Sequence, residues 1–401
     1  MFLASCANRP TMPEDPALQP GSPIPSPAGP QLSESVSEDE FYRYPTDLPS
    51  ADPGRLVRLQ ALEVPAGVRG WRVLYHSNSV DGRDVVVSGV VFAPDAPAEP
   101  GSRPVVAWGH GSVGLGDSCA PSRSPDDFTR QGILSELLDR GYVVAATDYE
   151  GLGTPGPHPW LVGQSEGRGV LDSVRAARQI PEAAASNRFV AFGASQGGGA
   201  VLFAGELAPD YAEDLELLGV VSAAPAAELD LLALLPQGNV SGAAGFVVMG
   251  AFGFKAAYPE LSLDAILYPD IIAQQERVER LCQSEIGSRF RTTRLDRLLK
   301  ASPAETEGWS QAIVENTPGR IRTPAPVFLV HGTADQVVPV EVSRLLFQRL
   351  CGRGVVTQMQ IYGGTDHFEV ISASSGDVLK WIDDRAAGRD PVREGSQQLC
   401  N

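Results

Sequence analysis

From about residue 103 onward, short apolar segments alternate with segments of helical periodicity, and this alternation limits the possible fold more than any other feature. The predicted strands cover residues 104–108, 142–147, 189–192, 218–223, 326–330 and 355–362, and the predicted helices cover residues 128–140, 165–179, 196–207, 340–349 and 375–387. Strands that alternate with helices form a mostly parallel sheet that is flanked by helices on both faces. We therefore predict an α/β fold.

The alternation is interrupted over residues 226–320, where helical patterns continue without convincing strands. A structureless loop of this length is uncommon in a compact domain. We predict a large helical cap, or lid, over the carboxyl edge of the sheet, where ligands bind in such folds. The core is then made of two parts, residues 51–225 and 321–401.

The start of the chain has a different composition. Residues 55–62, 70–76 and 85–92 are β-rich and separated by turn residues, so we expect antiparallel edge strands there. Residues 7 to about 50 are rich in Pro, Ser, Glu and Asp, with few apolar groups. Such a segment is predicted to be a disordered tether, so that residues 1–50 lie outside the folded body.

Ser195 lies between a predicted strand and a predicted helix, which is the setting of a nucleophile elbow. Gly193 and Gly197 flank it, because a turn this tight leaves no room for side chains. The turn directs the Ser195 hydroxyl out of the sheet and aims the helix N-terminus at the reacting carbonyl. A nucleotide-binding turn is the alternative, but the chain lacks a P-loop and a complete dinucleotide fingerprint. We expect no cofactor.

A nucleophilic serine needs a base that is oriented by an acid, and both are expected downstream in the order acid, then histidine. Asp335 and His367 lie on loops after two successive predicted strands. We predict that His367 is the base and Asp335 the acid. Asp366 is an alternative acid, but it adjoins His367 and would have to fold back to reach the ring.

The loop after the first predicted parallel strand is expected to donate one backbone N–H to an oxyanion hole, and Gln196 the other. Gly111 and Ser112 both fit the first position, and we favour Ser112. His110 is interpreted as a brace of this loop. Asp148 either faces the site or, as we favour, braces the turn around the oxyanion loop. The chain has five histidines and no His-Glu-x-x-His motif, so no metal site is expected.

Charge and hydropathy exclude two classes of partner. Acidic residues outnumber basic residues by 49 to 32, which gives a formal net charge of −17. This field repels a phosphate backbone, so we expect no nucleic-acid partner. No uninterrupted apolar run reaches the length of about 18 residues that a membrane-spanning helix needs. Nothing in the composition assigns an oligomeric state.

Cys6 is preceded by Leu3, Ala4 and Ser5, which resembles a bacterial lipobox and predicts lipidation of Cys6. A complete export signal has a charged segment and about 7–15 apolar residues before the processing site. Only five residues precede Cys6, so a start site placed too late and a chance match both stay open.

The four other cysteines form an even set if Cys6 carries lipid, as expected after export to an oxidising compartment. Their spacing allows three pairings and makes no zinc site. Buried free thiols in a cytosolic protein are the alternative. We predict an extracytoplasmic protein, secreted or lipid-anchored to the cell envelope, with this anchor as its only membrane contact.

Four motifs together resemble the secretory lipase family of α/β-hydrolases, the lipase-A-like group. They are residues 107–112 (Ala-Trp-Gly-His-Gly-Ser), 119–122 (Cys-Ala-Pro-Ser), 148–153 (Asp-Tyr-Glu-Gly-Leu-Gly) and 193–198 (Gly-Ala-Ser-Gln-Gly-Gly). The similarity runs from about residue 50 to the C-terminus. It implies carboxylic-ester hydrolysis, a helical lid, and the disulfides Cys119–Cys282 and Cys351–Cys400. Some members carry an acidic residue at the oxyanion loop where this chain has residues 110–112, which leaves the pH optimum and the chain-length preference open.

These observations predict a serine hydrolase that cleaves carboxylic esters through an acyl-enzyme. Short- to medium-chain acyl esters are the expected substrates, with weaker cleavage of triacylglycerol. Acyl transfer or peptide hydrolysis by the same triad is an alternative, because fold and triad do not fix the acceptor. A non-catalytic binding protein on a hydrolase scaffold is a second alternative.

An apolar stretch of the predicted cap, residues 246–254, contains Phe246, Met249 and Phe252. These three residues either form the wall of an acyl pocket over Ser195 or pack the cap against the sheet. The rest of the cap carries many charged residues, which favours a solvated lid over one that spreads on lipid. They are Glu276, Arg277, Glu279, Arg280, Arg289, Arg291, Arg294, Asp296 and Arg297.

Overall fold

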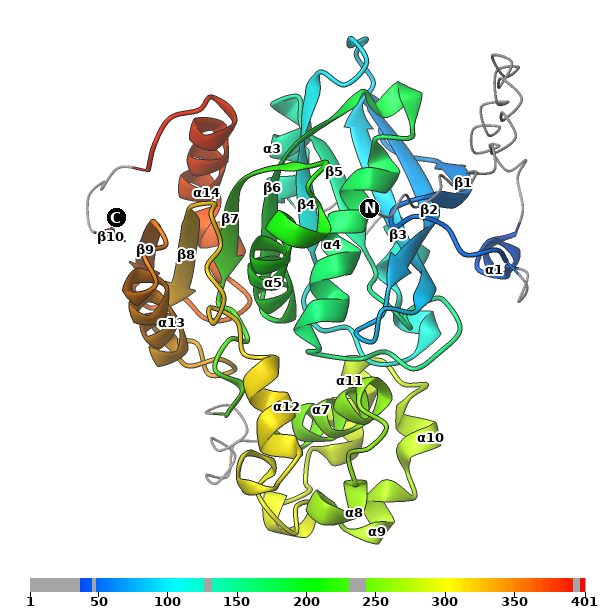
Figure 1. Ribbon diagram of the computed structural model, residues 1–401, viewed down its shortest axis with the longest axis vertical. Coiled ribbons are helices and arrows are strands. Elements are labelled where there is room, and N and C mark those ends of the chain that lie inside the picture. Colours follow the sequence, from blue (N-terminus) through cyan, green and yellow to red (C-terminus); the bar gives the residue numbers. More distant parts are fainter. Residues whose placement is uncertain (1–36, 45–47, 126–131, 231–242, 392–396, 401) are drawn as a thin grey trace, which may run out of the picture.

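One sheet of ten strands organises the part of the chain that the computed structural model describes, residues 37–44, 48–125, 132–230, 243–391 and 397–400 (Figure 1). Its strand order is β1-β2-β3-β5-β4-β6-β7-β8-β9-β10. From β5 to β9 in this order all neighbours are parallel, and the outer pairings are antiparallel. The predicted mostly parallel sheet is confirmed. The strands are β1 Leu56–Leu62, β2 Val68–Asn78, β3 Asp84–Pro94, β4 Arg103–Gly109, β5 Val143–Thr147, β6 Ala185–Ala194, β7 Glu216–Ala223, β8 Val327–Gly332, β9 Thr357–Tyr362 and β10 Gln398–Cys400.

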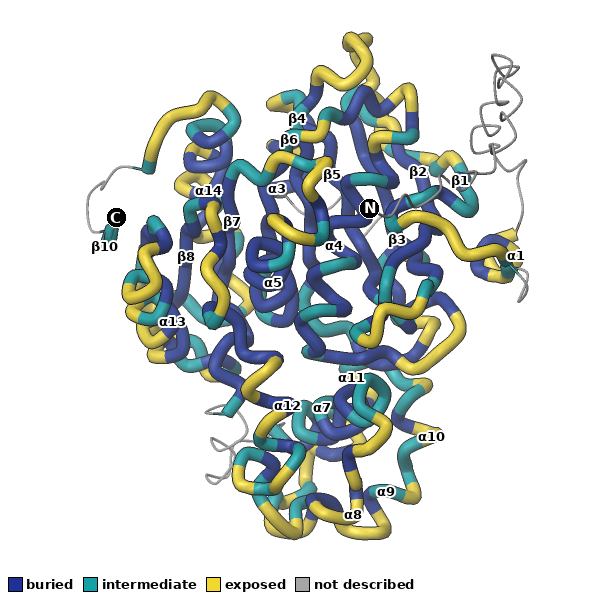
Figure 2. Tube along the Cα trace, viewed as in Figure 1, coloured by how far each residue is buried: buried dark blue, intermediate teal, exposed yellow. Residues whose placement is uncertain are grey.

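Helices cover both faces of this sheet. One apolar cluster joins α3 and α14 to one face, and a second joins α4, α5 and α13 to the other. The central strands are buried almost throughout (Figure 2), and they read as continuous apolar runs because both faces are covered. These helices are α3 Gly132–Asp139, α4 Gly163–Ala177, α5 Gln196–Tyr211, α13 Val340–Gly352 and α14 Val370–Ala386.

A group of helices between β7 and β8, here called the cap, gathers at the end of the molecule where the central strands have their carboxyl ends (Figure 1). It has an apolar cluster of its own, which also includes Trp160 and Val162 from the core. No helix among the described residues is long and apolar enough to cross a membrane. The cap helices are α7 Ala243–Ala257, α8 Leu263–Ile266, α9 Pro269–Ile272, α10 Gln275–Val278, α11 Gln283–Phe290 and α12 Trp309–Glu315. Short 3₁₀ turns are η1 Asp117–Cys119, η2 Pro121–Arg123, η3 Pro181–Ala183, η5 Leu295–Arg297 and η6 Pro303–Glu305.

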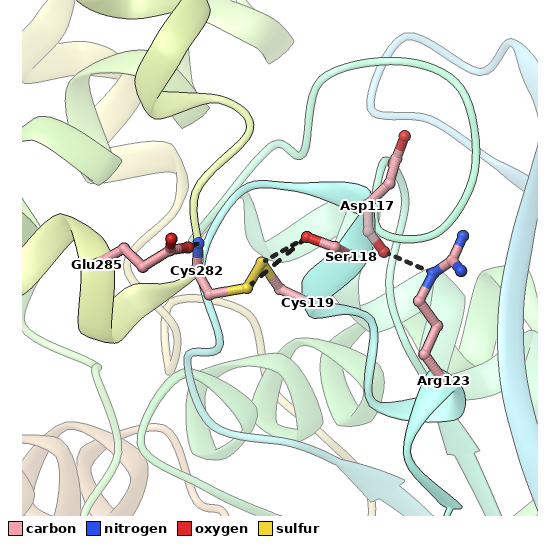
Figure 3. The surroundings of a disulfide bond; sticks show 6 residues. All are labelled: Asp117, Ser118, Cys119, Arg123, Cys282 and Glu285. Atoms are coloured by element: carbon pink, nitrogen blue, oxygen red, sulfur yellow. Dashed lines mark hydrogen bonds between the residues drawn. A yellow bond between two sulfur atoms is a disulfide. The ribbon is translucent and has the colours of Figure 1, made fainter.

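A disulfide between Cys119 and Cys282 joins the loop after β4 to the cap (Figure 3). Beside it the Leu115 N–H donates to the Leu281 carbonyl over 3.1 Å, and Gly114 forms an antiparallel bridge with Cys282. The cap is therefore fixed to the same loop that the sequence predicts to hold an oxyanion. The second pairing implied by the resemblance, Cys351–Cys400, is also present.

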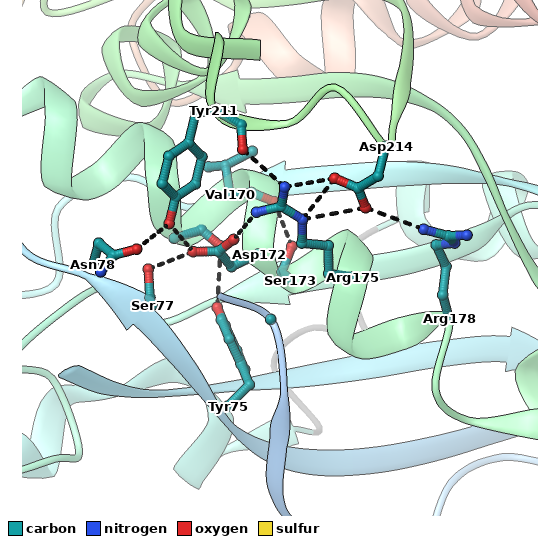
Figure 4. A network of polar contacts seen from close by, with 12 residues as sticks. Tyr75, Ser77, Asn78, Val170, Asp172, Ser173, Arg175, Arg178, Tyr211 and Asp214 are labelled. Atoms are coloured by element: carbon teal, nitrogen blue, oxygen red, sulfur yellow. Dashed lines mark hydrogen bonds and ion pairs between the residues drawn. The ribbon is translucent and has the colours of Figure 1, made fainter. Parts of the chain in front are cut away.

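A buried carboxylate ties β2, α4 and the end of α5 together (Figure 4). Asp172 accepts hydrogen bonds from the Ser77 hydroxyl at 2.7 Å and from the Tyr211 hydroxyl at 2.8 Å. It also pairs with Arg175 at 2.9 Å, and Arg175 in turn bonds Asp214. Burial raises the pKa of Asp172 to about 6, although these partners oppose the shift. The network fixes α4 against the sheet.

The described part of the N-terminal segment is folded, so the prediction of a disordered tether up to residue 50 is wrong for residues 37–44. A short helix, α1 Glu38–Phe41, leads into Tyr42, and Phe41 and Tyr42 are 0% and 4% exposed. The Tyr42 hydroxyl lies 2.6 Å from that of Ser122. The aromatic rings bury enough apolar surface to order the segment, although its average composition is polar.

Loss of the C-terminal disulfide should destabilise the protein. The bond between Cys351 and Cys400 spans a sequence separation of 49 and lies beside the pairing of β10 with β9. Loop-closure entropy predicts a loss of about 4 kcal/mol, within the usual range of about 2–5 kcal/mol. Urea unfolding of wild type and of the Cys351→Ser/Cys400→Ser variant measures it, and equal free energies of unfolding would contradict the expectation.

Candidate active site

The turn between β6 and α5 holds Ser195 in a conformation that residues other than glycine rarely adopt. Its φ is 58° and its ψ is −120°. The Ser195 N–H donates to the Ala223 carbonyl over 2.9 Å, and the Ser195 carbonyl accepts from the Ala226 N–H over 3.0 Å. These bonds fix the turn against the end of β7.

Two glycines allow this turn to pass close to its neighbours. A Cβ on Gly193 would collide with the Gly197 carbonyl, and a Cβ on Gly197 would collide with the Gly109 carbonyl at the end of β4. The elbow and the predicted oxyanion loop are therefore in direct backbone contact. Any larger side chain at either position would push them apart.

Asp335 and His367 meet on the loops that follow β8 and β9. The His367 Nδ1 lies 2.6 Å from Asp335 Oδ2. The two loops are joined by their backbones, because the Thr333 N–H donates to Tyr362 O and the Ala334 N–H donates to Thr365 O, each over 2.9 Å. The side chain of His367 is 8% exposed and that of Asp335 is 0% exposed. The predicted acid and the predicted base are thus paired at the sheet edge.

Asp335 accepts hydrogen bonds from every side. The N–H groups of Val337 and Val338 each lie 2.8 Å from Oδ1, and His331 Nε2 lies 3.1 Å from Oδ2. Burial alone raises the pKa of Asp335, but the bonds from His331 and His367 hold it well below its usual range. The carboxylate is therefore ionised and acts only as an acceptor, so His367 donates through Nδ1, and in the neutral ring Nε2 is the acceptor nitrogen.

The hydrogen bonds of His331 select the tautomer opposite to that of His367. Its Nε2 faces two acceptors, Asp335 Oδ2 and the Val338 carbonyl at 2.9 Å, and its Nδ1 lies 2.7 Å from the Ser343 hydroxyl. Nε2 must carry the proton, and Nδ1 accepts from Ser343. His331 thus helps to orient the acid.

The alternative acid, Asp366, has another use. Its Oδ1 accepts from the N–H groups of Phe368 and Glu369, each over 2.9 Å, just before α14 begins. This carboxylate caps the turn that leads into the helix. The structure brings Asp335, and not Asp366, to the ring of His367.

Ser195, the third residue of the predicted triad, follows β6. This strand is two strands away from β8 and three from β9 in the sheet. All three side chains come from loops at the carboxyl edge of parallel strands, which is the edge where ligands bind in α/β sheets. Among the described contacts there is no hydrogen bond between the Ser195 hydroxyl and His367. In substrate-free enzymes this bond is often long and tightens only with substrate.

His110 and Asp148 brace the oxyanion loop from behind. His110 Nδ1 lies 2.6 Å from the Gly111 carbonyl and Nε2 3.2 Å from the Asp148 carbonyl. The Asp148 carboxylate accepts from the Ser122 N–H over 2.9 Å and from the Ser88 hydroxyl over 2.6 Å. Burial lowers the pKa of His110 and raises that of Asp148. Neither side chain is placed as a catalyst.

Metal ligation has no candidate cluster in the part of the chain that the structure describes. No group of three or more His, Cys, Asp or Glu side chains is arranged there to hold an ion.

Ser112 and Gln196, the predicted oxyanion-hole residues, are joined by one indole. Trp160 Nε1 lies 3.0 Å from Ser112 Oγ and 3.0 Å from Gln196 Oε1. Gln196 is the first residue of α5, where backbone N–H groups have no partner within the helix. A Cβ on Gly111 would lie 3.7 Å from that of Ser195, so the loop passes directly beside the predicted nucleophile.

The side chain of Gln196 contacts two buried polar residues, Glu166 and His158. The Gln196 Nε2 donates to Glu166 Oε1 over 2.7 Å and lies 3.2 Å from His158 Nε2. Glu166 also accepts from the Leu161 N–H over 2.9 Å. Burial raises the pKa of Glu166 to about 8 and lowers that of His158 to about 3. Both side chains are therefore neutral near pH 7.

No motif predicts Trp160, His158 or Glu166. A signal exists for Glu166, because it shares one helical face with Val170 and Val174 at i, i+4 and i+8. That face is buried in the structure. Trp160 and His158 lie in a proline-containing loop without periodicity, and only the tertiary structure brings them to Gln196.

The three predicted acyl-pocket residues differ in their surroundings. Met249 and Phe252 are each 1% exposed and lie within the apolar cluster of the cap. This burial favours the packing alternative for both. Phe246 is only partly buried, and its ring stacks on Trp160 at 6.2 Å. It is the member that remains a candidate for the pocket wall.

Solved structures of ester hydrolases resemble this chain. Candida antarctica lipase A in its closed state matches with a TM-score of 0.77 and 18% identity, over 90% of this chain and 89% of that chain. The rice cell wall degrading esterase LipA from Xanthomonas oryzae matches with a TM-score of 0.71 and 18% identity, over 85% of this chain and 100% of that chain. The fold is the α/β-hydrolase fold, as predicted.

Sequence relatives give the family. A secreted triacylglycerol lipase of Malassezia globosa is 26% identical over 88% of this chain and 81% of its own length, and Lipase 9 of Candida albicans is 26% identical over 93% and 87%. Residues 129–394 match the model of the secretory lipase family. The protein is thus an α/β-hydrolase that cleaves carboxylic esters. The chain belongs to the secretory lipase family, and secreted relatives and two disulfides support an extracellular location.

The buried Glu166 should make stability fall as the pH rises. Its pKa is raised from 4.5 to about 8, so the folded state holds this proton more tightly than the unfolded state does. The stabilising effect is complete below about pH 4.5 and is lost as the pH rises toward about 8. Glu166→Gln keeps a side-chain oxygen as acceptor and removes the titrating group. The free energy of unfolding of this variant should therefore fall less steeply with pH than that of wild type, by up to about 1.4 kcal/mol per pH unit.

Urea unfolding at several pH values between about 5 and 8 measures both slopes. Glu136→Gln, at a half-exposed position on α3, is the matched control and should keep the slope of the wild type. Equal slopes for Glu166→Gln and wild type would contradict the expectation.

Proposed function

We propose that the protein hydrolyses short- and medium-chain carboxylic esters through an acyl-enzyme on Ser195. The observation that carries this proposal is the 2.6 Å bond between His367 Nδ1 and Asp335 Oδ2. Because the carboxylate binds the Nδ1 proton, the Nε2 lone pair is available to take the proton of the nucleophile. Asp335 stays ionised and stabilises the imidazolium that forms.

Acylation begins when the Ser195 Oγ bonds to the ester carbonyl carbon and its proton moves to His367 Nε2. The carbonyl oxygen becomes an oxyanion, which the backbone N–H groups of Ser112 and Gln196 stabilise. Collapse of this intermediate breaks the bond to the alkoxy oxygen, and the alcohol leaves with the proton from His367.

Deacylation repeats these steps with water. His367 Nε2 takes a proton from water as its oxygen bonds to the acyl carbon. Collapse breaks the bond to Ser195 Oγ, which regains its proton, and the carboxylic acid is released.

The surface of the cap favours short and medium acyl chains. Its charged residues, such as Arg280, Arg289 and Arg294, are exposed, and an exposed charged surface spreads poorly on lipid. The relatives named triacylglycerol lipases support lipid esters as substrates. We therefore place triacylglycerol among the substrates, cleaved more weakly than shorter esters.

A lipid anchor on Cys6 would retain the protein at the cell envelope. Cys6 lies outside the described residues, so this proposal rests on the lipobox-like sequence. The intact mass of protein from its native host, compared with that of a Cys6→Ser variant, tests for the diacyl group.

Loss of the nucleophile should abolish ester hydrolysis. We expect Ser195→Ala to lower kcat on p-nitrophenyl butyrate by about 10⁴- to 10⁶-fold, the size of effect seen for catalytic triads. Wild type should also be labelled by a fluorophosphonate, and the variant should not. Equal hydrolysis rates in the two proteins would refute the proposed mechanism.

Phe246→Trp should shorten the preferred acyl chain if Phe246 forms the pocket wall. A lost or added methylene in an apolar pocket changes specificity by about 10- to 200-fold. Activity on p-nitrophenyl esters from acetyl to oleoyl measures the profile, alongside Met249→Trp and Phe252→Trp. A shift confined to Phe246→Trp would match the burial of the other two, whereas unchanged profiles in all three folded variants would assign Phe246 to packing as well.

A further inference from the structure

The indole of Trp160 fixes the distance between two loops that come from different strands. Its single N–H is shared by Ser112 Oγ, on the loop after β4, and Gln196 Oε1, at the elbow after β6. Trp160 is 5% exposed. A buried donor that loses its acceptors is costly, so this contact holds both residues in one arrangement.

The side chain of Gln196 has no freedom to turn. Its Nε2 donates to Glu166 Oε1 and to His158 Nε2. His158 accepts at Nε2 because its Nδ1 donates to the Glu150 carbonyl over 2.7 Å. With both amide protons bound on this side, Oε1 must face Trp160. The network therefore determines the orientation of the residue whose backbone N–H is proposed to stabilise the oxyanion.

The other side of Trp160 is held by cap helix α7. A Cβ on Gly253 would lie 2.7 Å from the Trp160 backbone nitrogen and 2.9 Å from its Cβ, so the helix approaches as closely as backbones permit. Three residues from the start of α7, the ring of Phe246 stacks on the indole with an interplanar angle of 19°. The indole thus lies between the cap and the proposed oxyanion hole.

We propose that Trp160 is a positioning residue of the oxyanion hole, held in place by α7. It acts through Ser112 and Gln196 and touches no reacting atom. The inference rests on the proposed function, in which the backbone N–H groups of these two residues stabilise the tetrahedral intermediate. Because that contact forms in the transition state, loss of positioning lowers kcat and changes KM little.

The first test replaces the indole by a ring without an N–H. We expect Trp160→Phe to lower kcat on p-nitrophenyl butyrate by about 10- to 100-fold, since small misplacements of catalytic groups have effects of this size. KM should change little. The matched control is Trp309→Phe, because Trp309 is equally buried in the cap and donates to the Ser262 carbonyl over 3.1 Å. A kcat for Trp160→Phe within twofold of wild type would overturn the inference.

A double-mutant cycle separates positioning from general packing. Gln196→Met removes the side-chain oxygen that accepts from the indole N–H and keeps the backbone N–H of residue 196. Ser112→Ala likewise removes the hydroxyl acceptor on the other loop and keeps the backbone N–H of residue 112. If Trp160 acts through them, the effect of Trp160→Phe on kcat should shrink in either background. Losses that multiply in both backgrounds would contradict the inference. Should Trp160→Phe fail to fold, a loss of kcat in Gln196→Met tests the same contact from its other side, and an unchanged kcat there overturns it.

A pair of glycine substitutions tests the contribution of α7. Gly253→Ala introduces a methyl group against the Trp160 backbone and should lower kcat. Gly245→Ala lies on the same helix, where its Cβ would meet Gly287 of α11 at an ordinary 3.4 Å, and should keep kcat. Equal kcat in both folded variants would contradict the part assigned to α7.

The Ser195→Ala variant distinguishes the two levels of failure. If Ser195→Ala stays active, the proposed function fails and the inference about Trp160 fails with it. If Ser195→Ala is inactive while Trp160→Phe matches wild type, only the inference fails.

Discussion

The close backbone contact between the elbow and the end of β4 is the constraint on which the site depends. Ser195 has a positive φ of 58°, a conformation that costs on the order of 1–3 kcal/mol and persists only where the surroundings enforce it. Here Gly193 and Gly197 let the turn approach Gly109, and hydrogen bonds to Ala223 and Ala226 hold its other side. The proposed nucleophile, the first N–H groups of α5 and the proposed oxyanion loop are thereby fixed by one packing arrangement.

The proposed acid, Asp335, is fixed in a different way, because its carboxylate oxygens accept hydrogen bonds from four donors. Two backbone N–H groups and two histidines surround Asp335, and each supplies a donor. A buried carboxylate is costly unless such bonds compensate for the lost water. Because every lone pair is used, the carboxylate cannot rotate, and the tautomer of His367 follows from it. The orientation of the proposed base is thus a consequence of the hydrogen bonds that fix this carboxylate.

Much of the fold could be predicted from the sequence, because buried parallel strands appear as apolar runs and the elbow has a distinctive spacing. The errors occur where local composition opposes tertiary packing. Ser372 and Ser374 lower the helical propensity at the start of α14, so the sequence predicts the helix only from residue 375, whereas it begins at Val370. Phe41 and Tyr42 order a segment whose proline-rich surroundings predict disorder. β10, with three residues, depends on its pairing with β9 beside the Cys351–Cys400 bond.

In the site, too, residues fixed by local sequence could be predicted, and residues fixed by tertiary contacts could not. Ser195, Asp335 and His367 follow strands and could be predicted from their order along the chain, whereas Trp160 belongs to a loop that packs against cap helix α7. The glycines of α7 are the sequence signal for this contact. In an apolar helix, Gly253 lowers the helical propensity and packs no side chain, so its presence indicates close backbone approach by another element. That element is Trp160, and the interruption in the apolar run thus marks the place where the cap contacts the loop beside the proposed oxyanion hole.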